Sequence, residues 1–296
     1  MQPQNLQSKS KEPPQLTSKN VAALDKIFNW LCVNAIDPTA ISAMAERLGN
    51  PVTLTNIQIV LREKIFYSQF QIFNGNHQQL FHIKQAWEGN YLREVLALHL
   101  ATRVFDPELF VPDYLTGTYT GAGKKAKLAF PYIMTAFVKG KQVKFGFKKD
   151  PESPLWWWFG RHYFLHTLLS LYDVDPRHFL LEEEDKGMKG VKRIDLGLAF
   201  TKLDQSYDGF QSAFKGVEFE KNPAFQQGFA FEREKVLHNL QTNRFAVGEI
   251  LFEFTQLEMD HILDFDPNQF CQNLITYWRK AVPDLEIIPK SEPGSI

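Results

Sequence analysis

Hydrophobic and polar positions divide the chain into a strand-rich stretch between two largely helical ones. Over residues 21–48, apolar side chains recur with the i, i+3, i+4 spacing of an amphipathic helix, so we expect helices there. Residues 53–62, 65–73 and 79–85 are instead rich in β-branched and aromatic side chains, which favours strands. The sequence Asn-Gly-Asn at 74–76 lies between the last two strands and predicts a hairpin.

The strand-rich stretch also contains one helix. Apolar side chains recur with helical spacing from Tyr91 to Val104. Residues 117–127 are glycine-rich and resemble a hairpin, and residues 128–138 form a nearly continuous apolar run. Such a run is typical of a strand that is buried on both faces. The pattern therefore predicts an antiparallel sheet with one inserted helix.

The second half of the chain is predominantly helical. A long apolar helix is expected over 156–171, followed by two short strands over 179–182 and 191–194 with a charged turn between them. Amphipathic patterns then predict three further helices, over 230–241, 246–259 and 267–282.

Composition and charge limit the classes of function. The chain has 296 residues, 44% of them hydrophobic, which is enough for a large two-lobed unit with a buried core. The formal net charge of −1 gives no overall field for nucleic acid, and we expect no nucleic-acid partner. The segments 1–20 and 290–296 are polar and are predicted to be disordered tails.

The same sequence indicates an intracellular protein. Its N-terminus lacks the apolar segment of a secretory signal, and no stretch has the roughly 20 apolar residues of a membrane span. Cys32 and Cys271 lie far apart and suit two buried, reduced thiols. We therefore expect a soluble, cytoplasmic protein.

Three side chains with useful chemistry are predicted to lie close together. Asp173 and His178 precede the first short strand of the second half, and Asp195 follows the second. A loop before one strand and a turn after its antiparallel partner lie at the same end of the hairpin. Phosphoryl transfer needs an acidic group that orients the attacking hydroxyl and oxygen ligands for a magnesium ion.

The sequences around these residues resemble those of the protein-kinase-like superfamily. Its catalytic loop reads D-x-x-x-x-N and its metal loop D-F-G. Here DVDPRHFLL begins at Asp173 and RIDLGLAF contains Asp195. Both segments look more like the phosphoinositide-kinase and HipA-type branches than like ordinary protein kinases. The resemblance covers roughly residues 53–200 in order, and the helical remainder matches in class alone.

The resemblance implies an α+β, two-lobed kinase-like fold. A strand-rich N-lobe with one helix would span residues 21–140, including the helical extension, and a mostly helical C-lobe would span residues 141–289. It implies an ATP-dependent phosphotransferase that uses Mg²⁺ or Mn²⁺. The acceptor hydroxyl would belong to a protein, a lipid or a small molecule.

The resemblance also implies roles for individual residues. Asp173 would act as the catalytic acid–base or orienting group, and Asp195 and His178 would bind the metal ion. Lys84 would contact the nucleotide phosphates, and Glu94 would anchor Lys84. The hinge over the adenine would be Phe137-Val138-Lys139-Gly140, with Val138 as the contact residue.

Two departures from the family pattern support an alternative function. His178 stands where the family has an asparagine, and imidazole is a poor ligand for magnesium. Arg-Glu-Lys at 62–64 occupies the first turn, where glycines would let backbone amides meet phosphate. The alternative is a catalytically impaired pseudokinase that senses nucleotide or inositol phosphate.

Three further features have two readings each. Eight lysines between 124 and 149 form either a solvated face or a site for a polyanion such as an inositol phosphate. The run Trp156-Trp157-Trp158 either opens a core helix with one ring exposed or forms a surface patch. His162 and His166 either brace the core or join His178 and the nearby aspartates in a transition-metal site.

Overall fold

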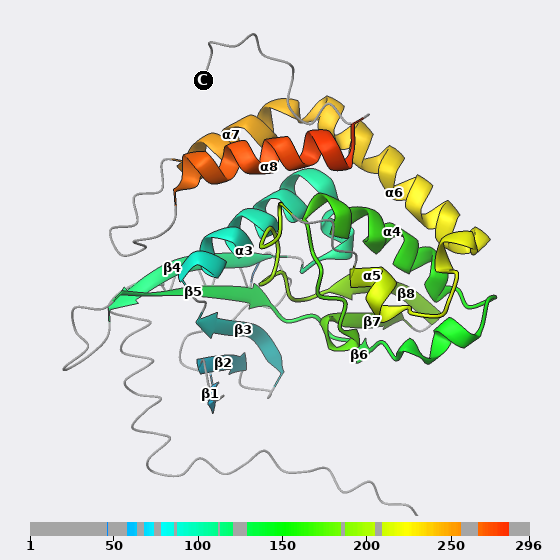
Figure 1. Ribbon diagram of the computed structural model, residues 1–296. Coiled ribbons are helices and arrows are strands. Elements are labelled where there is room, and N and C mark those ends of the chain that lie inside the picture. The colour runs from blue at the N-terminus through cyan, green and yellow to red at the C-terminus, as the bar shows by residue number, and fades with distance from the viewer. Residues whose placement is uncertain are drawn as a thin grey trace, which may run out of the picture.

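The computed structural model describes most of the chain beyond residue 57. The turn at 74–76, the expected helices over 21–48 and both expected tails lie outside the described residues, apart from Glu46. The first turn was expected at 62–64, but Arg62 and Glu63 end a strand and Lys64 lies outside the described residues. The described residues are Glu46, 58–63, 68–73, 78–85, 88–111, 113–120, 129–184, 187–204, 209–255 and 266–283. They form a mixed α+β fold with two antiparallel sheets and a helical majority (Figure 1).

The first sheet has five antiparallel strands in the order β1-β2-β3-β5-β4. The expected hairpin pairing is confirmed, because Gln69 of β2 is opposite Lys84 of β3. On its other side Lys84 is opposite Ile133 of β5, so it lies on the central strand of the sheet. The strands span β1 Gln58–Glu63, β2 Ser68–Phe73, β3 Gln79–Gln85, β4 Tyr114–Thr120 and β5 Ala129–Ala136.

The expected inserted helix is present as α3, Glu88–Leu100, which continues as a π-helical turn over Ala101–Phe105. Most of its side chains from Tyr91 onward are buried, because it is covered on more than one side. In Figure 1, α3 lies between the β4–β5 side of the sheet and the pair α7 and α8. Asp106 follows this turn and caps a short 3₁₀ helix, Pro107–Leu109, by accepting a hydrogen bond from the backbone N–H of Glu108.

The second sheet contains the two strands expected in the second half, but both extend into the expected charged turn, because Glu183 pairs with Met188 and Glu184 with Gly187. β7, Phe179–Glu184, pairs with β8, Gly187–Arg193, and also with the two-residue strand β6, Lys141–Gln142. A strand of two residues has no detectable alternation, so β6 could not be predicted from the hydrophobic pattern. Beyond β8, the N–H of Ile194 donates to the carbonyl of His178, which keeps His178 beside the residue preceding Asp195.

Helices α4, Leu155–Leu168, and α6, Pro223–Thr242, cross at two glycines. A Cβ atom on Gly160 would lie 2.1 Å from the carbonyl oxygen of Phe225, and one on Gly228 would lie 1.9 Å from that of Trp157. The two backbones are therefore in direct contact, which no larger residue would permit. On α4, Trp156 and Trp158 are buried and Trp157 is half-buried, so the core-helix reading of the tryptophan run is confirmed.

Two helix boundaries differ from those expected by three residues or more. Helix α6 begins at Pro223 rather than 230, because Asn222 caps it by accepting from the N–H of Phe225 and Pro223 suits the first position. Helix α4 ends at Leu168 rather than 171, since Ser170 has a φ of 47° and cannot continue the helix.

The remaining helices complete the C-terminal half, and none of the described helices is long and apolar enough to cross a membrane. Asp266 caps the last of them, as its carboxylate accepts from the N–H groups of Asn268 and Gln269. Cys271 is buried on that helix and forms no disulfide. These helices are α5 Gly209–Ala213, α7 Arg244–Thr255 and α8 Pro267–Ala281.

Candidate functional site

Lys84 and Glu94 form a buried ion pair between β3 and α3. Nζ of Lys84 lies 2.6 Å from Oε1 of Glu94, and Glu94 is 3% exposed. Lys84 is fixed in the central strand, and Glu94 lies in the second turn of α3, only ten positions later in the chain. Both side chains therefore reach the same space between β3 and α3.

Asp195 joins this pair from the other half of the chain. Its Oδ1 lies 3.1 Å from Nζ of Lys84 and accepts a hydrogen bond of 2.9 Å from the N–H of Gly197. A Cβ atom on Gly197 would lie 3.1 Å from Oδ1 of Asp195 and 3.3 Å from Oε2 of Glu94. A larger residue at this position would therefore press on both carboxylates.

The electrostatics keep Lys84 and Asp195 charged. Burial alone would lower the pKa of Lys84, but the carboxylates of Asp195 and Glu94 outweigh it and raise that pKa. Burial alone would raise the pKa of Asp195, but Lys84, His178 and the N–H of Gly197 hold it well below its usual range. Burial raises the pKa of Glu94, and the contact with Lys84 opposes this effect.

His178 and Asp173 lie beside Asp195. Nε2 of His178 is 3.8 Å from Oδ2 of Asp195, and Nδ1 of His178 is 3.1 Å from Oδ2 of Asp173. The ring is not aligned for a hydrogen bond through Nδ1. The side chain of Asp173 is 30% exposed and that of Asp195 is 40% exposed. Five predicted site residues, Lys84, Glu94, Asp173, His178 and Asp195, therefore meet in one place that solvent can reach.

Val138 differs from the other predicted site residues. It follows β5, and its side chain is buried in the hydrophobic core. The preceding residue, Phe137, donates its N–H to the carbonyl of Leu80 and is 43% exposed. A nucleotide at this segment would meet the main chain of Val138 and the side chain of Phe137 rather than the side chain of Val138.

The predicted lysine patch is described only in part. Lys139, Lys141, Lys144 and Lys149 are exposed, and Lys148 donates to the carbonyl of Ala213 at 3.1 Å. The lysines at 124, 125 and 127 lie outside the described residues.

The transition-metal alternative is wrong for His162 and His166. Both are buried, with Nε2 of His162 2.9 Å from the carbonyl of Val191 and Nε2 of His166 3.2 Å from Nη1 of Arg193. Burial lowers the pKa of His162 to about 3, so that ring stays neutral. Within the described part of the chain, no group of three or more His, Cys, Asp or Glu side chains could hold a metal ion.

The carboxylate of Asp195 nevertheless fits a magnesium ion that is held mainly by phosphate and water. Such sites use one or two protein carboxylates, and the remaining ligands come from the nucleotide and solvent. Oδ1 is engaged by Lys84 and Gly197, whereas Oδ2 faces Nε2 of His178. A nitrogen ligand beside a carboxylate favours Mn²⁺ over Mg²⁺.

Arg193 is a site residue that the sequence reasoning missed. It is 1% exposed, donates from Nε to the backbone oxygen of Asp195 at 2.7 Å, and lies over the ring of Phe179. Burial lowers its pKa to about 10, which still leaves it charged at neutral pH. An arginine at the end of the expected strand, two residues before Asp195, is the signal that could have identified it.

Comparisons with known proteins give little further information. No family model matches the chain, and no curated protein matches it. The structure is similar to that of an ethanolamine kinase from Plasmodium vivax, with a TM-score of 0.34 and 10% sequence identity over 95% of this chain and 98% of that one. A likeness at this level does not establish a shared function, so function has to be argued from the site.

Proposed function

We propose that this protein is a two-lobed, kinase-like phosphotransferase that transfers the γ-phosphoryl group of ATP to a hydroxyl group. The supporting observation is the cluster of Lys84, Glu94 and Asp195, in which a strand lysine is held between a helix carboxylate and the carboxylate of an Asp-Leu-Gly turn. Residues 21–140 would form the N-lobe and residues 141–289 the C-lobe.

Each residue of the site has a role in this proposal. Glu94 holds the ammonium of Lys84 in place, so that Lys84 meets phosphate oxygens without having to be ordered during binding. Asp195, with His178 as its neighbour, would hold a metal ion, which would supply positive charge beside the phosphates. Asp173, whose carboxylate reaches solvent, orients the acceptor hydroxyl.

The second candidate is a nucleotide-binding module without catalysis, possessing the same site. His178 favours it, because a nitrogen stands where the related catalytic loops carry an amide oxygen. The exposed lysines of the 139–149 segment would then bind a polyanion such as an inositol phosphate.

Thermal unfolding tests the nucleotide site directly. We expect ATP with Mg²⁺ or Mn²⁺ to raise Tm, with Mn²⁺ more effective because of His178, since a ligand that binds only the folded state stabilises it. Asp195→Asn should abolish the metal-dependent part of the shift. Asp150→Asn, an exposed aspartate on the loop before α4, is the matched control and should leave it unchanged.

Phosphoryl transfer distinguishes the two candidates. For the enzyme, Asp173→Asn should retain the nucleotide-dependent Tm shift and lose about a hundredfold to ten-thousandfold in ATP turnover. Nucleotide binding without turnover on any acceptor would favour the binding module. Absence of any nucleotide-dependent shift, or an unchanged shift in Asp195→Asn, would refute both.

A further inference from the structure

Arg193 is a buried cation behind the carboxylates of the candidate site. It is the last residue of β8 and is 1% exposed. Burial of an arginine is costly unless carboxylates compensate its charge directly. Within the part of the chain that the structure describes, its contacts are instead with the backbone oxygen of Asp195, a nitrogen of His166 and the ring of Phe179. Stability of the fold alone therefore does not account for a cation at this position.

Arg161 shows the usual arrangement of a buried arginine. It is also 1% exposed, but its guanidinium forms ion pairs with the carboxylates of Asp106, Glu108 and Glu232. The charge of Arg161 is thus compensated within its own cluster, whereas that of Arg193 is not.

The charge of Arg193 acts on the carboxylates of the site. Burial lowers the pKa of Arg193, and the carboxylates of Asp195, Asp173 and Glu94 oppose this effect. These carboxylates come from the turn after β8, the loop after α4 and helix α3. Like charges that are held close together repel one another, and a cation shared among them lowers this repulsion. Arg193 therefore helps the three carboxylates to lie in one place.

The hydrogen bond to Asp195 restrains the main chain of that residue. Nε of Arg193 donates to the backbone oxygen of Asp195 at 2.7 Å. On the preceding side, the N–H of Ile194 donates to the carbonyl of His178 at 3.0 Å. On the following side, the N–H of Gly197 donates to Oδ1 of Asp195 at 2.9 Å. Arg193 completes these restraints, and together they set the direction of the Asp195 carboxylate.

His166 holds the other side of the guanidinium. Nη1 of Arg193 is 3.2 Å from Nε2 of His166, and because a guanidinium can only donate, Nε2 accepts. Burial and the charge of Arg193 hold the pKa of His166 well below its usual value, so the ring is neutral and can accept.

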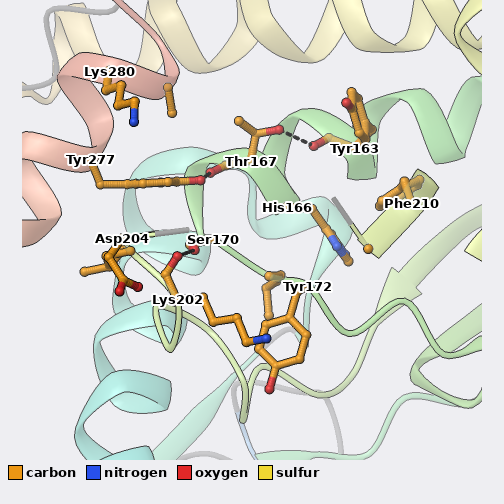
Figure 2. A pocket seen from close by; sticks show the side chains of 14 residues that line it. Tyr163, His166, Thr167, Ser170, Tyr172, Lys202, Asp204, Phe210, Tyr277 and Lys280 are labelled. Carbon is orange, nitrogen blue, oxygen red and sulfur yellow. Dashed lines mark hydrogen bonds between the residues drawn. The ribbon is translucent and has the colours of Figure 1, made fainter. Parts of the chain in front are cut away.

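The ring of His166 is itself fixed by packing. It lies nearly parallel to the ring of Phe179, at 15° and with centroids 5.8 Å apart. It meets the ring of Phe210 edge-on at 4.9 Å, and Figure 2 shows these two side chains beside each other. The acceptor for Arg193 therefore has a fixed position on α4.

We propose that Arg193 is a positioning residue for the metal ion of the proposed nucleotide site. It ties the main chain of Asp195 to α4, so that the carboxylate of Asp195 keeps the direction in which it meets the metal ion. Because Arg193 is buried, it acts through Asp195 rather than by contact with the ligand. This role rests on the proposed function.

Binding of ATP with and without metal tests this role. Calorimetry measures the affinity in excess Mn²⁺ and in EDTA, at a temperature at which every variant is folded. Arg193→Lys keeps the charge, but a single ammonium lacks the planar fork that reaches both Asp195 and His166. We expect it to weaken ATP binding about tenfold or more in Mn²⁺ and less than about threefold in EDTA, since side chains that orient a metal ligand act on metal affinity. Equal weakening in both conditions, or none, would overturn the proposal.

Variants of His166 test the same connection and leave Arg193 in place. His166→Phe keeps the aromatic packing but removes the acceptor, and it should weaken binding of the Mn²⁺–ATP complex about fivefold or more. His166→Gln returns an oxygen that can accept from Arg193, and it should recover most of this loss. If His166→Gln binds the complex no more tightly than His166→Phe, the connection through Arg193 does not act on the metal site.

Arg161→Lys is the matched control. Arg161 is as buried as Arg193, but its carboxylate partners belong to the separate cluster. This variant should lower Tm and leave the metal-dependent affinity for ATP unchanged. An equal loss of Mn²⁺–ATP affinity in Arg161→Lys and Arg193→Lys would attribute the loss to lower stability and overturn the proposal.

The native protein separates this role from the proposed function. No binding of ATP in either condition would refute the proposed function, and the role of Arg193 with it. Metal-dependent binding in the native protein that Arg193→Lys fully retains would refute the role of Arg193 alone.

Discussion

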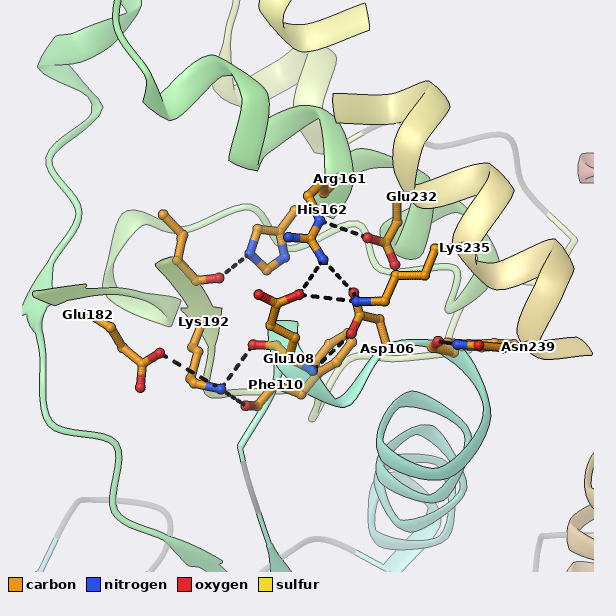
Figure 3. A network of polar contacts seen from close by, with 12 residues as sticks. Asp106, Glu108, Phe110, Arg161, His162, Glu182, Lys192, Glu232, Lys235 and Asn239 are labelled. Atoms are coloured by element: carbon orange, nitrogen blue, oxygen red, sulfur yellow. Dashed lines mark hydrogen bonds and ion pairs between the residues drawn. The ribbon is translucent and has the colours of Figure 1, made fainter. Parts of the chain in front are cut away.

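At the scale of single residues, the most unusual group is a buried charge cluster around Arg161 (Figure 3). Arg161 donates to Asp106 at 2.5 Å and to Glu232 at 2.8 Å, and both carboxylates are 0% exposed. Lys235 adds a second cation, and Glu108 a third carboxylate. Three carboxylates and two cations leave one negative charge in excess, and burying it is costly.

Glu232 is the residue that takes up a proton to balance this cluster. Burial and the negative charge of Asp106 raise the pKa of Glu232 to about 8, against the opposing effect of Arg161. Its Oε2 accepts from Arg161, whereas Oε1 is buried and has no donor as a partner. A hydrogen bond with the carboxylate of Asp106 also raises the pKa of Glu232, since a protonated carboxyl group can donate to a carboxylate.

We predict that stability falls as pH rises from about 4.5 to about 8, by an amount on the order of a few kcal/mol, because of Glu232. In this window the folded state holds the proton on Glu232 and the unfolded state has lost it. The contribution of Glu232 to stability is therefore fully present below about pH 4.5 and decreases as the pH rises to about 8. Urea denaturation at several pH values measures this dependence.

Two variants of α6 isolate the contribution of this residue. Glu232→Gln keeps the shape without a titrating group and should remove this part of the pH dependence. Glu234→Gln, an exposed glutamate two positions later, should keep the full dependence. Identical pH profiles for Glu232→Gln and the native protein would show that Glu232 is not protonated in the folded state.

At the scale of elements, the crossing of α4 and α6 depends on the two glycines where their backbones meet. Each glycine approaches a carbonyl oxygen of the opposite helix, and a backbone atom cannot rotate away as a side chain can. Glycine normally weakens a helix interior by roughly 1 kcal/mol. Here that cost is offset by the close packing that it permits.

We predict that Gly228→Ala destabilises the protein by about 3 kcal/mol, since its methyl group would lie 1.9 Å from the carbonyl oxygen of Trp157. Gly248→Ala on α7 is the control, because nothing lies within 4 Å of its added Cβ. That variant should stabilise the protein by up to about 1 kcal/mol through helix propensity. Equal effects of the two substitutions on urea denaturation would contradict the crossing geometry.

The elements themselves could largely be predicted, but their ends could not. The strands of the first sheet and α3 were expected because β-branched and aromatic runs favour strands and apolar residues recur with helical spacing from Tyr91 onward. The first seven residues of α6 were missed, although Asn222 and Pro223 together are a helix-start signal. The early end of α4 at Leu168 was also missed, because Tyr277 and Trp278 of α8 bind the last α4 carbonyls.

At the scale of the whole molecule, Lys84 joins the two halves of the chain. It is 111 residues from Asp195 in sequence, and its ammonium lies between that carboxylate and Glu94. A buried charge that loses its partner is strongly destabilising, whereas removal of both partners is tolerated better.

We predict that Lys84→Met lowers the free energy of unfolding by about 3 kcal/mol at neutral pH, because Glu94 is left buried without a cation. The double variant Lys84→Met/Glu94→Gln should recover most of this loss. Lys221→Met, in an exposed pair with Glu218, serves as the control and should change stability by less than about 0.5 kcal/mol. A double variant no more stable than Lys84→Met would contradict this assignment.

The sequence by itself determined the α+β class, most of the elements and the order of the charged residues along them. These features depend on residues a few positions apart, whose periodicity and turn chemistry can be read directly. Only the tertiary structure decided that Lys84 meets Asp195, that Arg193 links Asp195 to His166, and that Glu232 is buried beside Asp106 and Arg161. Those contacts arise where distant elements pack, and local periodicity carries no information about which distant side chains will face one another.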